Sequence, residues 1–241
     1  MSIPDFTYRT SEEEIMDDFY LQGEELRRTL EDLDKVNKWL GGNRITLEGI
    51  RKLLPTKSSG RIRIVDVGCG NGTLLREIAA FGRKEDLNFE LLGIDANEYA
   101  IEIARELAAD FPEISFKALN IFSEEFAGIE ADIILCTLTL HHFKDPQIAQ
   151  LLRLFLQNSR LGVVINDLER SPLAYHLFQA FCSVFIHNEI ARKDGLISIR
   201  RGFKKEDLEN FGRKLPAKQE LHWKWAFRYQ WILYKEQTEE L

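Results

Sequence analysis

Three glycines at alternate positions are the feature that most constrains the fold of this 241-residue chain. The run Gly68-Cys69-Gly70-Asn71-Gly72 lies between a β-rich segment, 62–67, and a helical stripe that begins at Leu74. Glycines at a strand-to-helix turn let the backbone pass close to a ligand, because no Cβ is in the way. The spacing is not the Gly-x-Gly-x-x-Gly of dinucleotide folds, and no Gly-Lys-Ser/Thr follows as in a P-loop. We therefore expect a ligand at this turn, with a purely structural turn as the alternative.

From Arg61 onward, short β-rich segments alternate with helical stripes. The strand candidates are 62–67, 89–94, 114–119, 133–136 and 163–165. Such alternation predicts a parallel sheet with helices on both faces. The aromatic runs 221–227 and 229–234 almost touch, which favours a closing antiparallel pair at the sheet edge. The expected fold class is therefore α/β, a Rossmann-like, doubly wound, seven-stranded and mostly parallel sheet with an antiparallel C-terminal pair.

Helical additions extend this core on both sides. Residues 11–40 carry apolar side chains at helical spacing, and a second helical stretch, 45–54, is followed by a polar connector at 57–60. We therefore divide the chain into an N-terminal helical extension, 1–60, and a ligand-binding domain, 61–241. The aromatic-rich segment 172–192 is expected to be one helical cap insertion, which closes over the ligands together with the extension.

Composition and charge exclude several classes of protein. Acidic residues outnumber basic ones by 39 to 32, which removes the overall attraction that non-specific nucleic-acid binding uses. The three cysteines lie far apart, with none of the spacings that hold zinc or form a redox dithiol, so we expect no metal and a reducing compartment. With no leader-like start and no apolar run of about 18 residues, we expect a cytoplasmic protein without a membrane span.

A carboxylate ends the second strand candidate, in the sequence Gly93-Ile94-Asp95. Parallel strands end at one edge of the sheet, so Asp95 is expected beside the glycine turn. A carboxylate at that place can accept hydrogen bonds from both hydroxyls of a ribose. Nicotinamide cofactors and adenosyl ligands both contain such a ribose, so Asp95 alone does not distinguish these two classes of ligand. The glycine spacing is the feature that distinguishes them.

These two motifs, together with segment 131–143, resemble class I S-adenosylmethionine-dependent methyltransferases over residues 61–167. Stretches 166–176 and 194–203 are similar to small-molecule methyltransferases of polyketide, pigment and quinone pathways. The resemblance implies S-adenosylmethionine as cofactor, S-adenosylhomocysteine as product, and a small, aromatic acceptor methylated on oxygen or carbon. A non-catalytic, S-adenosylmethionine-binding regulatory protein is the alternative.

The resemblance further implies a cofactor site at the ends of the first four strands. The glycine turn would face the methionine part of the cofactor, Asp95 the ribose and Ala96 the adenine. Asn120 departs from the acidic residue that the family often has there, but its amide can still accept from the adenine amino group. The residues expected in this site are Asp66, Gly68, Cys69, Gly70, Asp95, Ala96, Asn120, Ile121, Cys136 and Leu138.

Methyl transfer needs little covalent help from a protein, because the sulfonium leaving group is already activated and the two reactants mainly need positioning. Phenolic or carbon acceptors also lose a proton, which a base can take. The candidate bases are His141, His142, Asp167 and His176. The alternatives are packing for one of the two adjacent histidines, a helix cap for Asp167 and a surface position for His176.

The expected partner is a small-molecule acceptor and not a nucleic acid. A methyltransferase of base amino groups would carry a segment like Asn/Asp-Pro-Pro-Tyr after the fourth strand, to hold a flipped base. The segment there, Cys136-Thr137-Leu138-Thr139, is different. The sequence leaves the oligomeric state open between monomer and homodimer.

Overall fold

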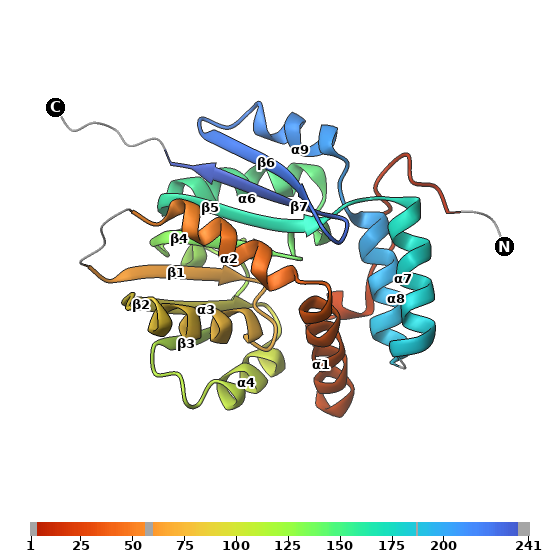
Figure 1. Cartoon of the computed structure of the whole chain (residues 1–241), viewed down its shortest axis with the longest axis horizontal. Helices are drawn as coiled ribbons and strands as arrows, with labels where there is room; N and C mark the ends of the chain where they lie inside the picture. Colours follow the sequence, from red (N-terminus) through yellow and green to blue (C-terminus); the bar gives the residue numbers. More distant parts are fainter. Residues whose placement is uncertain (1–3, 56–59, 187, 236–241) are drawn as a thin grey trace.

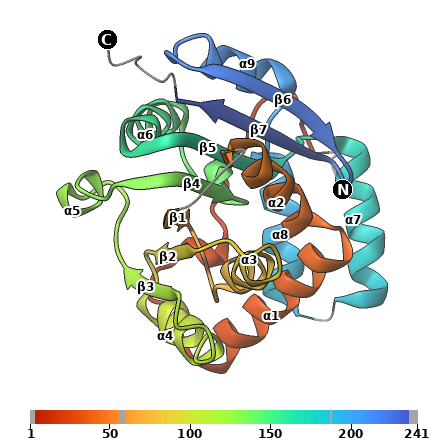
Figure 2. The same cartoon turned by 60° about the vertical axis from the view of Figure 1, so that its left-hand side comes forward.

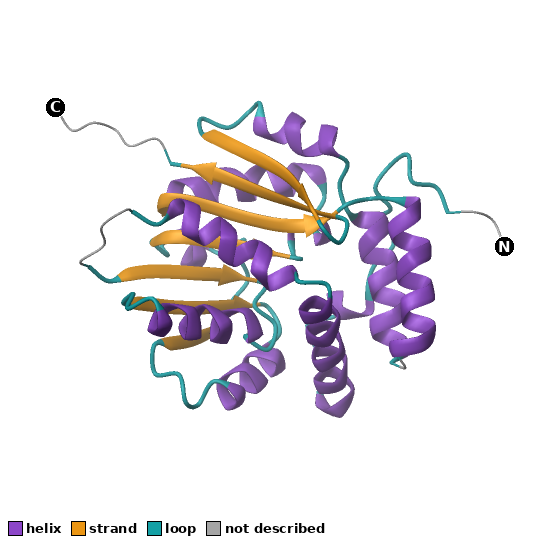
Figure 3. Cartoon of the chain, viewed as in Figure 1, coloured by secondary structure: helices purple, strands orange, loops and turns teal. Residues whose placement is uncertain are grey.

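A computed structural model describes residues 4–55, 60–186 and 188–235 and contains a seven-stranded sheet in the order β3-β2-β1-β4-β5-β7-β6 (Figures 1 and 3). The first five strands run parallel, and β7 pairs antiparallel with both β5 and β6. This arrangement confirms the fold class expected from the sequence. The strands are β1 (Ile62–Val67), β2 (Phe89–Asp95), β3 (Ile114–Ala118), β4 (Ala131–Thr137), β5 (Ser159–Leu168), β6 (Lys218–Lys224) and β7 (Arg228–Tyr234).

Helices cover both faces of the sheet (Figure 2). One face packs against α2 (Gly42–Leu53), α3 (Thr73–Lys84) and α4 (Glu98–Leu107). The other packs against α5 (Glu124–Ala127), α6 (Asp145–Asn158) and α9 (Lys205–Gly212). Neighbouring side chains of a central strand, such as Ile64 and Val65, therefore enter different cores and are both fully buried. Burial on both faces is the reason why the central strands are continuously apolar.

A third group of helices lies beyond the carboxyl ends of the parallel strands, at the right of Figure 1. It consists of η1 (Ile15–Asp17), α1 (Gly23–Trp39), α7 (Pro172–Phe185) and α8 (Glu189–Arg201). The expectation of one helical insertion over 172–192 was wrong in its bounds. The Asn188 side chain accepts hydrogen bonds from the amides of Ile190 and Ala191 and so caps a second helix, which continues to Arg201.

Other boundaries also differ from those expected. β5 extends over ten residues where three were expected, because it pairs with β4 on one side and β7 on the other. β6 ends at Lys224, since the chain reverses at 225–227 before β7. Of the polar connector expected at 57–60, residues 57–59 lie outside the described residues. Within the described ranges, no helix is both long and apolar enough to cross a membrane.

Candidate active site

A cavity of about 1950 Å³ opens at the carboxyl edge of the parallel strands. Its floor is the glycine turn with the end of β2, and its roof is formed by residues 7–19, α1, α7 and α8. Sites for one small ligand usually measure about 300–1,000 Å³. This cavity therefore has room for two ligands side by side.

The glycine turn brings bare backbone to the cavity floor. Gly68 has a φ of +73°, and a Cβ at this position would lie 2.3 Å from the Thr139 hydroxyl oxygen. The Gly68 and Cys69 amides donate to the Ile94 carbonyl oxygen, at 2.8 and 3.1 Å, which ties the turn to β2. Only glycine fits position 68, because any side chain would be strained and would collide with Thr139.

The Asp95 carboxylate is fixed at the edge of this floor. It accepts hydrogen bonds from the Gly70 amide at 2.9 Å and from the Asn97 amide at 3.0 Å. Burial raises the pKa of Asp95, and these amide hydrogen bonds oppose that rise. A carboxylate held in this way can accept two vicinal hydroxyls without first having to order itself.

Asp66 lies below the turn and is 2% exposed. Its Oδ1 atom is buried without a hydrogen-bond partner among the described residues, and Asp66 is one of the residues that line the cavity. Burial and the nearby Asp95 carboxylate raise the pKa of Asp66 to about 8. The neutral acid is therefore the favoured form of Asp66 at neutral pH.

The structure brings nearly all of the expected cofactor residues to the cavity lining, and Cys136 is the exception. Cys136 is fully buried, with its side chain in the core between the sheet and α6, so it offers no atom to a ligand. Asn120 does line the cavity, where its Oδ1 accepts from the Phe122 amide at 2.9 Å. The expected residues found in the lining are Asp66, Gly68, Cys69, Gly70, Asp95, Ala96, Asn120, Ile121 and Leu138.

His141 faces the cavity and is held from behind by Asp167. The Asp167 Oδ1 lies 2.7 Å from His141 Nδ1, and Oδ2 accepts from the His141 amide at 3.2 Å. Burial alone would raise the pKa of Asp167, but the charge and hydrogen bond of His141 outweigh it and lower the pKa. The sequence suggested Asp167 as a candidate base, but the structure places it behind His141, outside the described lining of the cavity, where it orients that imidazole.

His142 has a parallel arrangement with a different carboxylate. Its Nδ1 lies 2.6 Å from Asp17 Oδ1, and the other Asp17 oxygen is 2.5 Å from Arg201 Nη1. Burial opposes ionisation of Asp17, yet the hydrogen bonds from His142 and Arg201 hold its pKa well below the usual range. Both histidines thus direct Nδ1 toward a carboxylate and leave Nε2 for the cavity.

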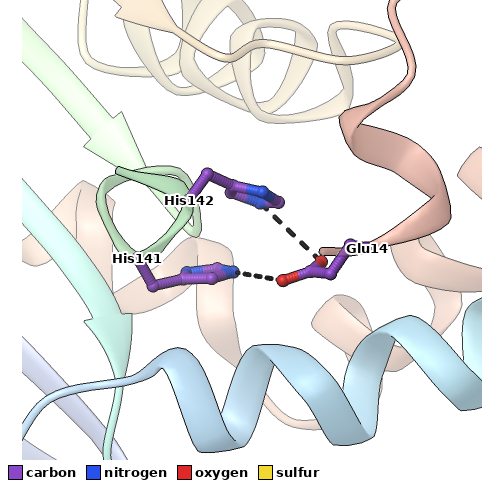
Figure 4. A group of neighbouring side chains, drawn as sticks. All are labelled: Glu14, His141 and His142. Carbon is purple, nitrogen blue, oxygen red and sulfur yellow. Dashed lines mark ion pairs between the residues drawn. The ribbon is translucent and has the colours of Figure 1, made fainter. Parts of the chain in front are cut away.

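Glu14, which the sequence did not single out, lies between the two free imidazole nitrogens (Figure 4). Its Oε1 is 3.6 Å from His141 Nε2, and its Oε2 is 3.9 Å from His142 Nε2. The Ser198 hydroxyl donates to Oε2 at 2.8 Å. Burial raises the pKa of Glu14 to about 7, against the opposing effects of His142, Ser198 and Arg201. Three carboxylates and two histidines therefore meet at the roof of one cavity.

His176 is not part of this group. It is exposed on α7, where its ring contacts Tyr175 with 5.5 Å between centroids, and it lies outside the described lining of the cavity. The surface alternative was the correct interpretation, so His176 is removed from the candidate bases. On the inner side of the same helix, Leu177, Phe178 and Phe181 give the cavity an apolar wall.

Arg228 is a second lining residue that the sequence did not indicate. It opens β7, is 2% exposed, and leaves Nε and Nη1 without hydrogen-bond partners among the described residues. Burial lowers the pKa of Arg228 to about 10, although the Asp167 charge opposes this. A buried cation in such a position has to be matched by charge from the cavity or tolerated at a cost in stability.

Comparison with known proteins agrees with this geometry. A family model described as "Methyltransferase domain" matches residues 58–226. The ubiquinone biosynthesis O-methyltransferase of Alkalilimnicola ehrlichii is 31% identical over 47% of this chain and 44% of its own length. The enzyme of that name from Acinetobacter baylyi is 26% identical over 70% of this chain and 71% of its own length. The chain thus spans less than half of one of these relatives and about seven-tenths of the other.

Solved structures with this fold include the plantazolicin methyltransferase BpumL in complex with a monoazolic analogue and S-adenosylhomocysteine. It is 18% identical, has a TM-score of 0.62, and covers 87% of this chain and 90% of its own. The strand order, the glycine turn after β1 and Asp95 at the end of β2 agree with the resemblance to class I S-adenosylmethionine-dependent methyltransferases. The chain belongs to the methyltransferase-domain family, whose model covers more than half of it.

Proposed function

We propose that this protein binds S-adenosylmethionine on the cavity floor and transfers its methyl group to a small aromatic acceptor held under the roof. The observation that carries the proposal is that one cavity joins the glycine turn and Asp95 to the paired histidines and the aromatic wall of α7. The names of the curated relatives support an oxygen acceptor of the phenol or quinol kind.

The floor residues fit the cofactor by shape and by charge. The bare backbone at Gly68 admits a ligand where a side chain would collide, and the Asp95 carboxylate offers acceptors for the ribose hydroxyls. When bound, S-adenosylmethionine supplies a methyl group on a positively charged sulfur, ready to leave. The remaining lining residues expected from the sequence, from Asp66 to Leu138, would complete the site without Cys136.

The roof supplies the acceptor side of the reaction. The N-terminal extension and the helices after β5 exclude water and hold the acceptor so that its nucleophilic atom points at the methyl carbon. Transfer would be an in-line displacement, so the roof would have to hold the acceptor oxygen opposite the carbon–sulfur bond that breaks, whose electron pair would stay on sulfur. The phenolic proton would pass to the Nε2 atom of His141 or of His142. In this proposal the extension 1–60 supplies part of the roof, and the domain 61–241 supplies the floor together with the rest of the roof.

Two measurements test the function. Calorimetry should show one molecule of S-adenosylmethionine bound per chain, in preference to NAD. Incubation with methyl-labelled S-adenosylmethionine and a panel of phenols, hydroquinones and cell extract should then give a labelled small molecule, identified by mass spectrometry. Tighter binding of NAD would contradict the cofactor assignment. Tight binding of S-adenosylmethionine with no labelled product from any acceptor would instead favour the regulatory alternative.

A further inference from the structure

The Glu14–His141–His142 cluster has the geometry of a metal-binding site. One ligand atom from each residue, Glu14 oxygen and two imidazole nitrogens, lies within 4.8 Å of the others. The oxygen–nitrogen separations are 3.6 and 3.9 Å. A tetrahedral ion with bonds of about 2.0–2.2 Å needs its ligands about 3.3–3.5 Å apart. The two separations involve different Glu14 oxygens, and the ligand atoms of the whole group lie within 4.8 Å, so the side chains would have to move by up to about 1 Å to close around an ion.

The atoms that face one another in the cluster are unsatisfied. His141 Nε2 and Glu14 Oε1 are buried and have no hydrogen-bond partner in the described part of the chain. The side chains of the two residues are only 2% and 4% exposed. Buried polar atoms without partners are rare and call for an explanation. The remaining contact of Glu14 Oε1 is Arg201 Nη1 at 3.5 Å, which is too long for a strong ion pair.

The outer contacts of the cluster also fit a metal. Asp167 and Asp17 each contact the Nδ1 of one histidine, which leaves both Nε2 atoms facing Glu14. Carboxylates behind ligating histidines fix the tautomer and raise the basicity of the ligand nitrogen. A helix–loop contact stiffens the glutamate side, because Asp194 accepts from the Ile15 amide at 2.9 Å. The ligands are thus oriented before any ion arrives.

The charge balance favours a cation as well. Glu14, Asp17 and Asp167 lie around the two histidines, and Arg201 is the cation among their ion-pair partners. A dication bound between Glu14 and the two Nε2 atoms would offset the excess of negative charge.

We propose that Glu14, His141 and His142 bind one divalent transition-metal ion, with zinc as the first candidate, at the roof of the active-site cavity. Two imidazoles and one carboxylate suit zinc or its neighbours in the first transition row better than magnesium or calcium, which prefer oxygen ligands. A fourth coordination position would face the cavity. Resting on the proposed function, we assign that position to the acceptor oxygen, which a metal would hold and help to ionise.

The test uses the full chain after treatment with a chelator. Titration with Zn²⁺ should show one tight site in the calorimeter, and Co²⁺ should give a visible absorption spectrum that reports the ligand geometry. Glu14→Gln and His142→Ala should weaken Zn²⁺ binding by tenfold or more, and Asp17→Asn by about 10–100-fold. His176→Ala removes an exposed histidine and should leave binding unchanged, which makes it the matched control.

Several outcomes would overturn the site. If Zn²⁺ does not bind to the stripped wild-type chain, the cluster is not a metal site, whereas retained S-adenosylmethionine binding would leave the proposed function intact. Equal Zn²⁺ affinity in wild type, Glu14→Gln and His142→Ala would place the ion elsewhere, for example at the exposed pair Glu220 and His222. Circular dichroism and S-adenosylmethionine affinity measured on each variant separate loss of the site from loss of folding. Equal turnover of stripped and zinc-loaded enzyme would overturn the assigned role toward the acceptor.

Discussion

The floor and the roof of the cavity are built in different ways. The floor consists of backbone from one turn, 68–72, and one carboxylate, Asp95, which bonds to the turn directly. The roof cluster is made of side chains from segments far apart in the chain, since Glu14 meets His141 and also Ser198, 184 residues later. The floor therefore depends on local geometry, and the roof depends on the whole fold being in place.

The two regions also differ in how they are stabilised. The floor continues the strands of a sheet whose core residues are almost completely buried and apolar. The N-terminal part of the roof is attached by polar contacts, such as those of Arg9 with the carbonyl oxygens of His141 and Phe143 at 2.7 and 3.0 Å. Because different interactions hold the floor and the roof, a mutation in one of them should leave the function of the other nearly unchanged.

Replacement of His141 by alanine should have the largest effect and should act on the roof alone. Loss of this imidazole removes either a proton acceptor or a metal ligand, so turnover should fall by about a hundredfold or more. Affinity for S-adenosylmethionine should stay nearly unchanged, because His141 is on the acceptor side. Kinetics and calorimetry on the same preparation measure both, with His176→Ala as the control. Equal losses of turnover and cofactor affinity would show that floor and roof do not act separately.

Replacement of Asp95 by alanine should have the opposite pattern, with cofactor binding impaired and the roof unaffected. The loss of charge-assisted hydrogen bonds to a ribose should weaken S-adenosylmethionine binding by at least about tenfold, or 1.4 kcal/mol. Zinc affinity at the roof should be unaffected. Asp110→Ala, which removes an exposed carboxylate, provides the control. Unchanged cofactor affinity in Asp95→Ala would refute the ribose assignment.

The sequence predicted the floor and the sheet well because both are local. Alternating apolar segments identified five parallel strands, and the glycine spacing identified the turn. α6 was missed, although Ile148, Leu151, Leu152 and Phe155 have helical spacing and Pro146 marks its first turn. Cys136 was misplaced because the strand end gives its position along the chain but not the face on which its side chain lies.

The roof could not be predicted in the same way. Glu14 belongs to the run Glu12-Glu13-Glu14, which reads as a solvated acidic stretch, and only the fold decides that the third glutamate is buried. The cysteines are not paired in the sequence, so no metal site was expected. A single sequence cannot show that a glutamate 127 residues before His141 approaches the ring of that histidine. The histidines were found because they directly follow a strand, but their carboxylate partners come from tertiary contacts.

The protonation of Asp66, at the floor of the cavity, should make the free energy of unfolding depend on pH. Variants of the roof should not change this dependence. The Asp66 pKa of about 8 lies above the ordinary value of 3.8, so the folded chain holds a proton that the unfolded chain releases between these values. This contribution to stability is fully present below about pH 4 and is lost as the pH rises to 8, by at most about 1.4 kcal/mol per pH unit. Asp66→Asn should flatten that slope in urea unfolding measured from pH 5 to 8. A slope identical to that of wild type would contradict a neutral Asp66.

The smallest expected effect concerns Arg228, the first residue of β7, whose buried guanidinium faces the cavity. With Nε and Nη1 unpartnered in the described structure, the charge carries a desolvation cost that nothing in the protein fully offsets. Arg228→Met keeps the length of the side chain and removes the charge, so the ligand-free protein should gain about 1 kcal/mol in free energy of unfolding. Denaturant unfolding measures the change, and the exposed Arg153→Met should stay within about 0.5 kcal/mol of wild type. A clear loss of stability in Arg228→Met would mean instead that the guanidinium holds the roof together, and that the roof is less separable from the sheet than its contacts indicate.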